Sequence, residues 1–155
     1  MENIDNDVIK SFGEEWNYYK QDNAEDLSPA FYQYFDIFPK EFLNNEKIGF
    51  DMGCGSGRWA KFIAPRVKSL NCIEPSIQAL KVAKNNLKKF RNCNFECASS
   101  NTTSLEDKSQ DFGYCLGVLH HTPDPQVGLT NCVKKLKKGS PFLLYLYYKF
   151  DNRPK

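Results

Sequence analysis

Three glycines alternate with other residues directly after an apolar run that begins at Ile48. The run continues into Asp51-Met52-Gly53-Cys54-Gly55-Ser56-Gly57, and a helical pattern follows. Glycine lacks a Cβ atom, so a turn of this composition lets backbone N–H groups approach a ligand closely. In an open α/β sheet, such a strand-to-helix turn lies at the crevice where cofactors bind. The stretch therefore predicts a cofactor site.

The spacing of the glycines narrows the class of ligand. A dinucleotide fingerprint has the form G-x-G-x-x-G, and counting from Gly53 and Gly55 the third glycine is replaced by Arg58. A phosphate-binding P-loop is also absent, because no G-K-[ST] follows the glycines. We therefore disfavour a nicotinamide-dependent dehydrogenase.

An acidic residue, Glu74, ends the second apolar run about 20 residues after the glycine turn, where a Rossmann-type domain keeps an acid for ribose hydroxyls. A carboxylate can accept hydrogen bonds from both hydroxyls of a vicinal diol. The alternative is an exposed loop carboxylate without a ligand. We expect Glu74 to hold a ribose.

The only two histidines, His120 and His121, follow the fourth apolar run, which places at least one of them near the crevice. Imidazole titrates near neutral pH, so His120 is a candidate general base that would take the proton of an acceptor. Alternatively, the histidines cap a loop or orient the turn formed by residues 123–125. No cluster of Asp, Glu and His has the spacing of metal ligands, and we expect no metal.

Short apolar runs alternate with helical patterns from Lys47 onward. The expected strands cover residues 48–52, 70–73, 94–98, 111–118 and 142–148, and the expected helices residues 58–64, 77–87 and 125–139. This alternation predicts an α/β fold with a doubly wound, Rossmann-like parallel sheet of about five strands.

Residues 1–46 are expected to form an N-terminal helical cap, and residues 47–155 the cofactor-binding core, together one compact domain. Near-helical spacing of apolar residues predicts an opening helix within residues 4–19, and Ser28-Pro29 predicts the start of a second helix. The second helix carries an aromatic stripe of Phe31, Tyr34, Phe35 and Phe38. Packing in the core is the expected role of this stripe, and a lid over a pocket is the alternative.

Composition limits the partners. The 155 residues carry a net charge of only +2, which favours small-molecule partners over nucleic acid or anionic membranes. No apolar run approaches the roughly 20 residues that span a bilayer, so a cytoplasmic protein is expected. The six cysteines are scattered without a C-x-x-C pair, and we expect reduced, mostly buried thiols, with Cys97 among those in apolar strands.

Five segments in order carry a resemblance to a known family. They are residues 51–57, 72–76, 95–100, 111–121 and 136–144. In sequence and spacing they resemble the motifs of class I S-adenosylmethionine-dependent methyltransferases of the methyltransferase type 11 kind. The resemblance runs from about residue 48 to residue 148 and implies a strand order of 3-2-1-4-5. It also implies transfer of a methyl group from S-adenosyl-L-methionine to a small-molecule acceptor.

The resemblance further implies a set of cofactor-binding residues. These are Asp51, Gly53, Cys54, Gly55, Gly57, Glu74, Pro75, Ser76, Ser99, Ser100, Leu116 and Gly117. At the adenine, the family usually has an aspartate where this chain has Ser99 or Ser100. The leading helices often cap the cofactor in such proteins, which is the role expected of residues 12–19.

The family fold continues beyond the fifth strand with a helix and an antiparallel strand pair, for which the printed sequence has no counterpart. We therefore expect a chain truncated after the fifth strand, and a homodimer through the exposed fifth strand. The alternative to a minimal methyltransferase is an S-adenosylmethionine-binding module or fragment without catalytic activity of its own.

Overall fold

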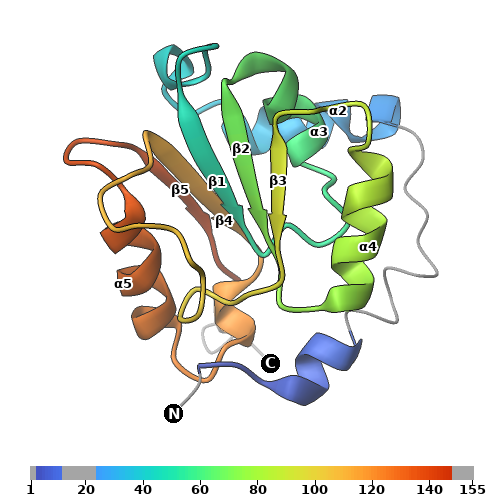
Figure 1. Cartoon of the computed structure of the whole chain (residues 1–155), viewed down its shortest axis with the longest axis vertical. Helices are drawn as coiled ribbons and strands as arrows, with labels where there is room; N and C mark the ends of the chain where they lie inside the picture. Colours follow the sequence, from blue (N-terminus) through green and yellow to red (C-terminus); the bar gives the residue numbers. More distant parts are fainter. Residues whose placement is uncertain (1–2, 12–23, 148–155) are drawn as a thin grey trace, which may run out of the picture.

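Five parallel strands form the centre of the computed structural model, which describes residues 3–11 and 24–147 (Figure 1). The strands are β1 (Ile48–Met52), β2 (Ser69–Ile73), β3 (Cys93–Glu96), β4 (Phe112–Leu116) and β5 (Phe142–Tyr145). Their order across the sheet is β3-β2-β1-β4-β5, and every pairing is parallel. This arrangement confirms the predicted Rossmann-like fold.

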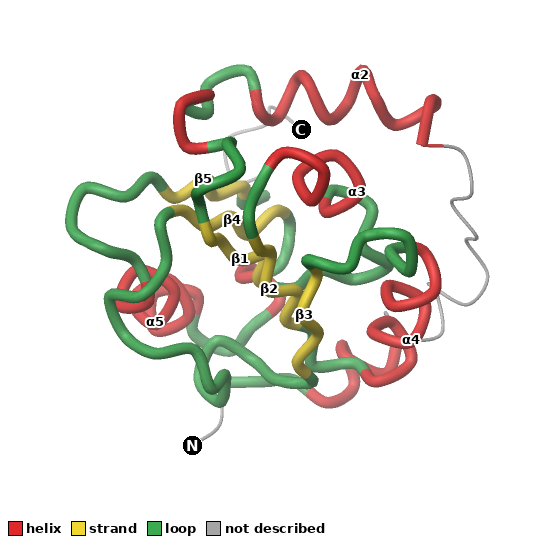
Figure 2. The backbone as a smooth tube through the Cα atoms, turned by 45° about the horizontal axis from the view of Figure 1, so that its top comes forward, coloured by secondary structure: helices red, strands yellow, loops and turns green. Residues whose placement is uncertain are grey.

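Helices cover both faces of the sheet. They are α2 (Ala24–Phe35), α3 (Ala60–Ile63), α4 (Ile77–Asn86) and α5 (Pro125–Lys135), with 3-10 turns η1 (Lys40–Phe42), η2 (Ala64–Arg66) and η3 (Leu119–His121). Apolar residues of α2, α3 and α4 pack in one cluster with one face of the strands, and α5 packs in a second cluster with the other face. Figure 2 shows α5 on the opposite side of the sheet from α2 and α3.

The two central strands pack through reciprocal pairs of glycine and phenylalanine. Gly49 of β1 lies opposite Phe112 of β4, and Phe50 lies opposite Gly113. A Cβ atom at Gly49 would come within 2.2 Å of the Phe112 ring, and one at Gly113 within 2.4 Å of the Phe50 ring. Each glycine therefore makes room for a buried ring, one on each face of the sheet.

The start of α2 differs from the prediction. The helix begins at Ala24, not at Ser28, and Pro29 lies inside it. Phe31 and Phe35 of the helix are buried in the cluster that packs against β4, and Phe38, which follows the end of the helix, is buried in the same cluster. Residues 6–11 are helical, and residues 12–19, expected to cap the cofactor, lie outside the described part of the chain. The division between an N-terminal cap and a core at residue 46 stays a prediction.

Five of the six cysteines are buried, and all six are free thiols. The prediction for Cys97 was wrong: it is exposed and lies just beyond the last residue of β3, Glu96. Within residues 3–11 and 24–147, no helix is long and apolar enough to cross a membrane. In the same residues, no group of three or more Cys, His, Asp or Glu side chains is placed to hold a metal ion.

Candidate cofactor site and active site

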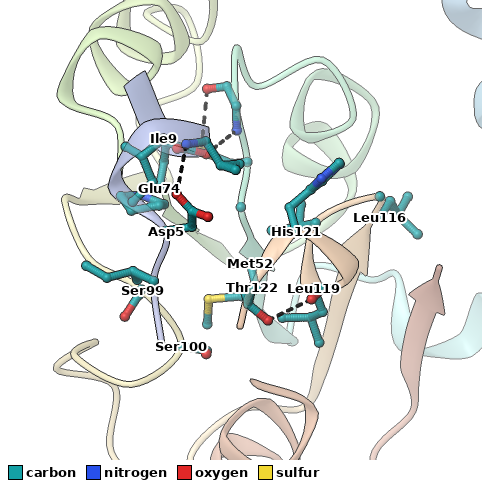
Figure 3. A pocket seen from close by; sticks show the side chains of 18 of the residues that line it. Asp5, Ile9, Met52, Glu74, Ser99, Ser100, Leu116, Leu119, His121 and Thr122 are labelled. Carbon is teal, nitrogen blue, oxygen red and sulfur yellow. Dashed lines mark hydrogen bonds between the residues drawn. The ribbon is translucent and has the colours of Figure 1, made fainter. Parts of the chain in front are cut away.

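A cavity of about 470 Å³ lies at the carboxyl ends of β1, β2 and β4, with Met52, Glu74 and Leu116 in its wall. Its volume falls in the range of roughly 300–1,000 Å³ that small-molecule sites occupy. Figure 3 shows Glu74 and Ser99 on one side of the cavity and His121 and Leu116 on the other. The cavity thus has two ends with different chemistry.

The glycine turn is left-handed at all three glycines, with φ of 76° at Gly53, 53° at Gly55 and 76° at Gly57. A side chain would be strained at each of these positions. A Cβ at Gly53 would also come within 2.6 Å of Val118, and one at Gly57 within 2.7 Å of Leu87. The turn therefore requires glycine for its own conformation as well as for access to the cavity.

The backbone donors of this turn differ from the expectation, because they are used within the chain. The N–H groups of Gly53 and Cys54 donate to the Ile73 carbonyl at 2.8 and 3.0 Å, and that of Gly57 donates to the Cys54 carbonyl at 2.8 Å. The N–H of Gly55 donates to a carboxylate oxygen of Glu74 at 2.9 Å. These four donors are not directed at a phosphate, which fits a cofactor without a pyrophosphate.

Glu74 is held at the end of β2 by two backbone donors. Its Oε2 accepts the N–H of Gly55 and its Oε1 accepts the N–H of Ser76, both at 2.9 Å. Burial raises the pKa of Glu74, and the two N–H groups oppose that rise. Each carboxylate oxygen keeps a second acceptor position. Glu74, only 8% exposed, is thus a fixed acceptor pair in the cavity wall.

Asp51 lies behind the glycine turn and is 2% exposed. Its Oδ2 and the hydroxyl of Tyr114 make no hydrogen bond of standard geometry within the described chain, although the hydroxyl is close enough to lower the pKa of Asp51. Burial outweighs that effect and, with the nearby charge of Glu74, raises the pKa of Asp51 to about 8. A buried carboxyl group whose Oδ2 has no hydrogen-bond partner among the described residues therefore lies behind the glycine turn.

Nine of the twelve predicted cofactor residues line the cavity. They are Gly53, Cys54, Gly55, Glu74, Pro75, Ser99, Ser100, Leu116 and Gly117. The other three, Asp51, Gly57 and Ser76, lie behind the lining, where Ser76 caps α4 by accepting the N–H of Ala79. Gly117 has a φ of 74°, and a Cβ built there would meet no atom within 4 Å. Space beside Gly117 is thus open to a ligand.

The two histidines have different surroundings. His121 lines the cavity, but His120 does not. The ring of His120 lies 4.4 Å from that of Tyr147, and its Nδ1 accepts the backbone N–H of Tyr147 at 3.5 Å. Burial lowers the pKa of both histidines, and the neighbouring His121 adds to the effect at His120. His121, and not the predicted His120, has the position of a residue that could meet an acceptor.

Several lining residues were not predicted from the sequence. The N-terminal segment supplies Asn3, Ile4, Asp5, Val8 and Ile9, and the chain after the glycine turn supplies Arg58 and Trp59. The helical spacing of Ile4, Val8 and Ile9 was visible in the sequence, but it pointed to a buried helix face and not to this cavity. Trp59 and Arg58 stack on each other at 4.8 Å.

A parallel sheet of this strand order, with a glycine turn after β1 and a carboxylate at the end of β2, is a Rossmann-like fold, which S-adenosylmethionine-dependent methyltransferases share with dinucleotide-binding enzymes. The sequence profile of the methyltransferase domain matches residues 50–144, more than half of the chain. The chain belongs to this methyltransferase domain family.

Several relatives are ubiquinone biosynthesis O-methyltransferases. That of Idiomarina loihiensis is 33% identical over 91 residues, which are 57% of this chain and 37% of the relative. That of Coxiella burnetii is 28% identical over 121 residues, which are 68% of this chain and 52% of the relative. The chain therefore spans about half or less of the length of these relatives.

Solved structures share the fold. A Methanococcus maripaludis protein described as a putative S-adenosylmethionine-dependent methyltransferase aligns with a TM-score of 0.72 and 15% identity, covering 94% of this chain and 67% of that one. Phosphoethanolamine N-methyltransferase 1 of Haemonchus contortus, solved with phosphoethanolamine and S-adenosylhomocysteine, aligns with a TM-score of 0.69 and 18% identity, covering 84% of this chain and 30% of that one.

Proposed function

We propose that the cavity binds S-adenosylmethionine and that the chain transfers its methyl group to a small-molecule acceptor. The observation that carries the proposal is Glu74, a buried carboxylate tied to the glycine turn and facing a cavity of about 470 Å³. The names of the relatives, which are O-methyltransferases, support a small acceptor. When bound, the cofactor would supply an electrophilic methyl group.

The two ends of the cavity orient the cofactor. Glu74 would accept the ribose hydroxyls, and Pro75, Ser99 and Ser100 would border the adenine on the same side (Figure 3). The methionine moiety would then lie between the glycine turn and Leu116-Gly117, with Asp51 behind it. This orientation directs the methyl group to the side of the cavity where His121 lies.

Calorimetric titration tests cofactor binding directly. We expect S-adenosylmethionine and S-adenosylhomocysteine to bind with one site per chain, and NAD to give no heat at the same concentrations. NAD binding without S-adenosylhomocysteine binding would overturn the proposal. A screen of small hydroxyl and amine acceptors with the bound donor then distinguishes an enzyme from the alternative, a module that binds the cofactor without turnover.

Replacing Glu74 with alanine is expected to weaken S-adenosylhomocysteine binding by roughly 10- to 150-fold, because hydrogen bonds to a charged group contribute roughly 1.5–3 kcal/mol. Glu96→Ala is the matched control. Glu96 also ends a strand and accepts two hydrogen bonds, from Thr103 and Ser104, but it does not line the cavity. Equal affinities of the Glu74→Ala and Glu96→Ala proteins would remove Glu74 from the site.

We propose His121 as the general base for acceptors that must lose a proton. Its side chain lines the end of the cavity opposite Glu74 and Ser99 (Figure 3). Burial lowers its pKa, so that near neutral pH the ring is neutral and has a nitrogen lone pair that can accept a proton. As the acceptor atom bonds to the methyl carbon and the bond between that carbon and the sulfonium sulfur breaks to leave a neutral thioether, the proton of the acceptor would pass to a ring nitrogen of His121.

We also propose that two copies associate through the open edge of β5. In the described sheet β5 pairs with β4 alone, and the neighbouring Leu146 and Tyr147 are exposed. Unpaired apolar strand edges favour association. Light scattering after size exclusion is expected to give the mass of a dimer or a larger assembly, and the mass of a monomer at high concentration would refute this arrangement.

The location of the protein in the cytoplasm also stays a prediction.

A further inference from the structure

Asn3 is a buried polar residue, 6% exposed, at the start of the described chain. Its Nδ2 donates to the carbonyl of Asp124 at 2.7 Å, and its Oδ1 accepts the N–H of Asp124 at 2.8 Å. One side-chain amide thus pairs with both backbone groups of one residue, as a neighbouring strand would. Burial of an amide without such partners would be costly. Asn3 therefore ties the N-terminus to a point 121 residues later in the chain.

The point of attachment is itself well fixed. Asp124 is the N-cap of α5, and its carboxylate accepts the N–H groups of Gln126 and Val127 at 2.9 and 3.1 Å. In the first turns of α5, a Cβ at Gly128 would come within 2.8 Å of Leu119 and 3.7 Å of the Asn3 amide. The amide of Asn3 is therefore packed against a helix that belongs to the core.

The residues that follow Asn3 cover the cavity. We call residues 3–11 the N-terminal strap. Its Asp5 accepts the N–H groups of Asp7 and Val8 at 3.0 and 3.2 Å and so begins the helical part of the strap. Ile4, Asp5, Val8 and Ile9 line the cavity. Figure 3 places Asp5 and Ile9 on the same side as Glu74 and Ser99, the side assigned to ribose and adenine.

We propose that Asn3 is a positioning residue that latches the N-terminal strap over the adenosine half of the cofactor, and that the strap slows cofactor release. This inference rests on the proposed function, because it assigns an occupant to the same cavity. Val8 and Ile9 are half-buried, while Asp7, Lys10 and Ser11 are exposed. The strap is thus a single layer with one face on the cavity, held at its start by Asn3.

Stopped-flow dissociation of S-adenosylhomocysteine is the test. We expect Asn3→Ala to release the ligand at least about fivefold faster, because two hydrogen bonds of the latch are lost. Asp124→Asn is the matched control: it keeps the backbone groups that Asn3 binds and a side chain suited to capping, so release should be unchanged. Trypsin cleavage after Lys10 gives a second readout, expected to be slowed by S-adenosylhomocysteine in the wild type and less so in Asn3→Ala.

Two further outcomes separate the possible failures. No binding of S-adenosylhomocysteine to the wild type would refute the proposed function, whereas normal binding with equal release from wild type and Asn3→Ala would refute the latch alone. If Asn3→Ala fails to fold, the double variant Val8→Ser and Ile9→Ser keeps the latch and removes the apolar cover. Faster release from that variant supports the strap, and unchanged release overturns it.

Discussion

Replacing His121 with glutamine is expected to lower kcat by roughly 10²–10⁴-fold for an acceptor that must lose a proton, the usual contribution of a general base. The affinity for S-adenosylhomocysteine should change little, because His121 lies at the end of the cavity away from Glu74 and Ser99 (Figure 3). Glutamine keeps a polar side chain of similar reach but cannot hold the proton. The loss should therefore fall on kcat and not on cofactor binding.

His120→Gln is the matched control for this prediction. His120 neighbours His121 in the chain, has a ring centroid only 4.0 Å away, and also has a lowered pKa. It lies against Tyr147 and outside the cavity lining, so its replacement should leave kcat within a few-fold of the wild type. Equal losses in the two variants would mean that the pair acts through the structure of η3, and His121 would lose its role as base.

The strands could be predicted closely because each is a short apolar run that the sheet buries. The prediction for β1 matches its bounds, and those for β2 and β3 begin within one residue of the observed strands. In β4, successive residues enter opposite clusters: Tyr114 packs in one cluster and Cys115 in the other. Burial of this kind depends on local sequence, so local sequence reveals it.

The choice between the two histidines could not be made from the sequence. His120 and His121 lie in the 3-10 turn η3, where successive side chains point about 120° apart. One residue of difference therefore decides which ring enters the cavity, and no apolar pattern records it. The role of Asn3 could not be predicted either, because its partner is the backbone of Asp124, 121 residues later in the chain. Neither contact has a local signature.

The start of α2 was missed for a related reason. Ser28-Pro29 has the form of a helix N-terminus, yet the helix begins at Ala24 and continues through Pro29. Phe31 and Phe35, which pack in the core, follow Pro29 and are helical with either start, so they do not reveal the residues before it. At the glycine turn, a cavity lies where the sequence predicts a cofactor site. The backbone N–H groups that we expected to face a ligand instead donate to Ile73 and Glu74.

Asp51 makes the stability of the ligand-free protein depend on pH. In the unfolded chain this carboxyl group ionises near pH 4, whereas burial raises its pKa to about 8 in the folded protein. Between these values the folded state keeps a proton that the unfolded state has lost, so the contribution of Asp51 to stability becomes less favourable as pH rises from about 4 to about 8. Above about pH 8 the effect is constant.

Asp51→Asn is therefore expected to be increasingly stabilised relative to the wild type as pH rises. The gain in unfolding free energy between pH 4 and pH 8 should reach several kcal/mol, since one unit of pKa corresponds to about 1.4 kcal/mol. Urea unfolding at several pH values measures the free energy of unfolding of both proteins. Any pH-independent effect of the asparagine amide on stability cancels when the difference between the proteins at one pH is compared with that at another. A pH-independent difference between the two proteins would show that Asp51 has the same pKa in the folded and unfolded states.

Asp111→Asn is the matched control, with the opposite sign. Burial alone would raise the pKa of Asp111, but Lys137 at 2.8 Å and the backbone N–H of Ile48 at 2.9 Å lower it. Its carboxylate therefore stabilises the fold above the unfolded pKa and loses that contribution as pH falls through the folded one. Asp111→Asn should be less stable than the wild type at neutral pH and approach it in acid.

The same carboxyl group should link cofactor binding to proton release. S-adenosylmethionine carries an ammonium and a sulfonium charge, and a positive charge close to Asp51 favours the ionised form of its carboxyl group. Binding near pH 7 is then expected to release a proton, which calorimetry in buffers of different ionisation enthalpy detects, and Asp51→Asn should bind more weakly and lose this release. Glu74, Tyr114 and Arg58 influence Asp51 from the surrounding elements, and none of them changes in this variant. Proton release that persists in Asp51→Asn would assign the linkage to Glu74, whose pKa is also raised by burial.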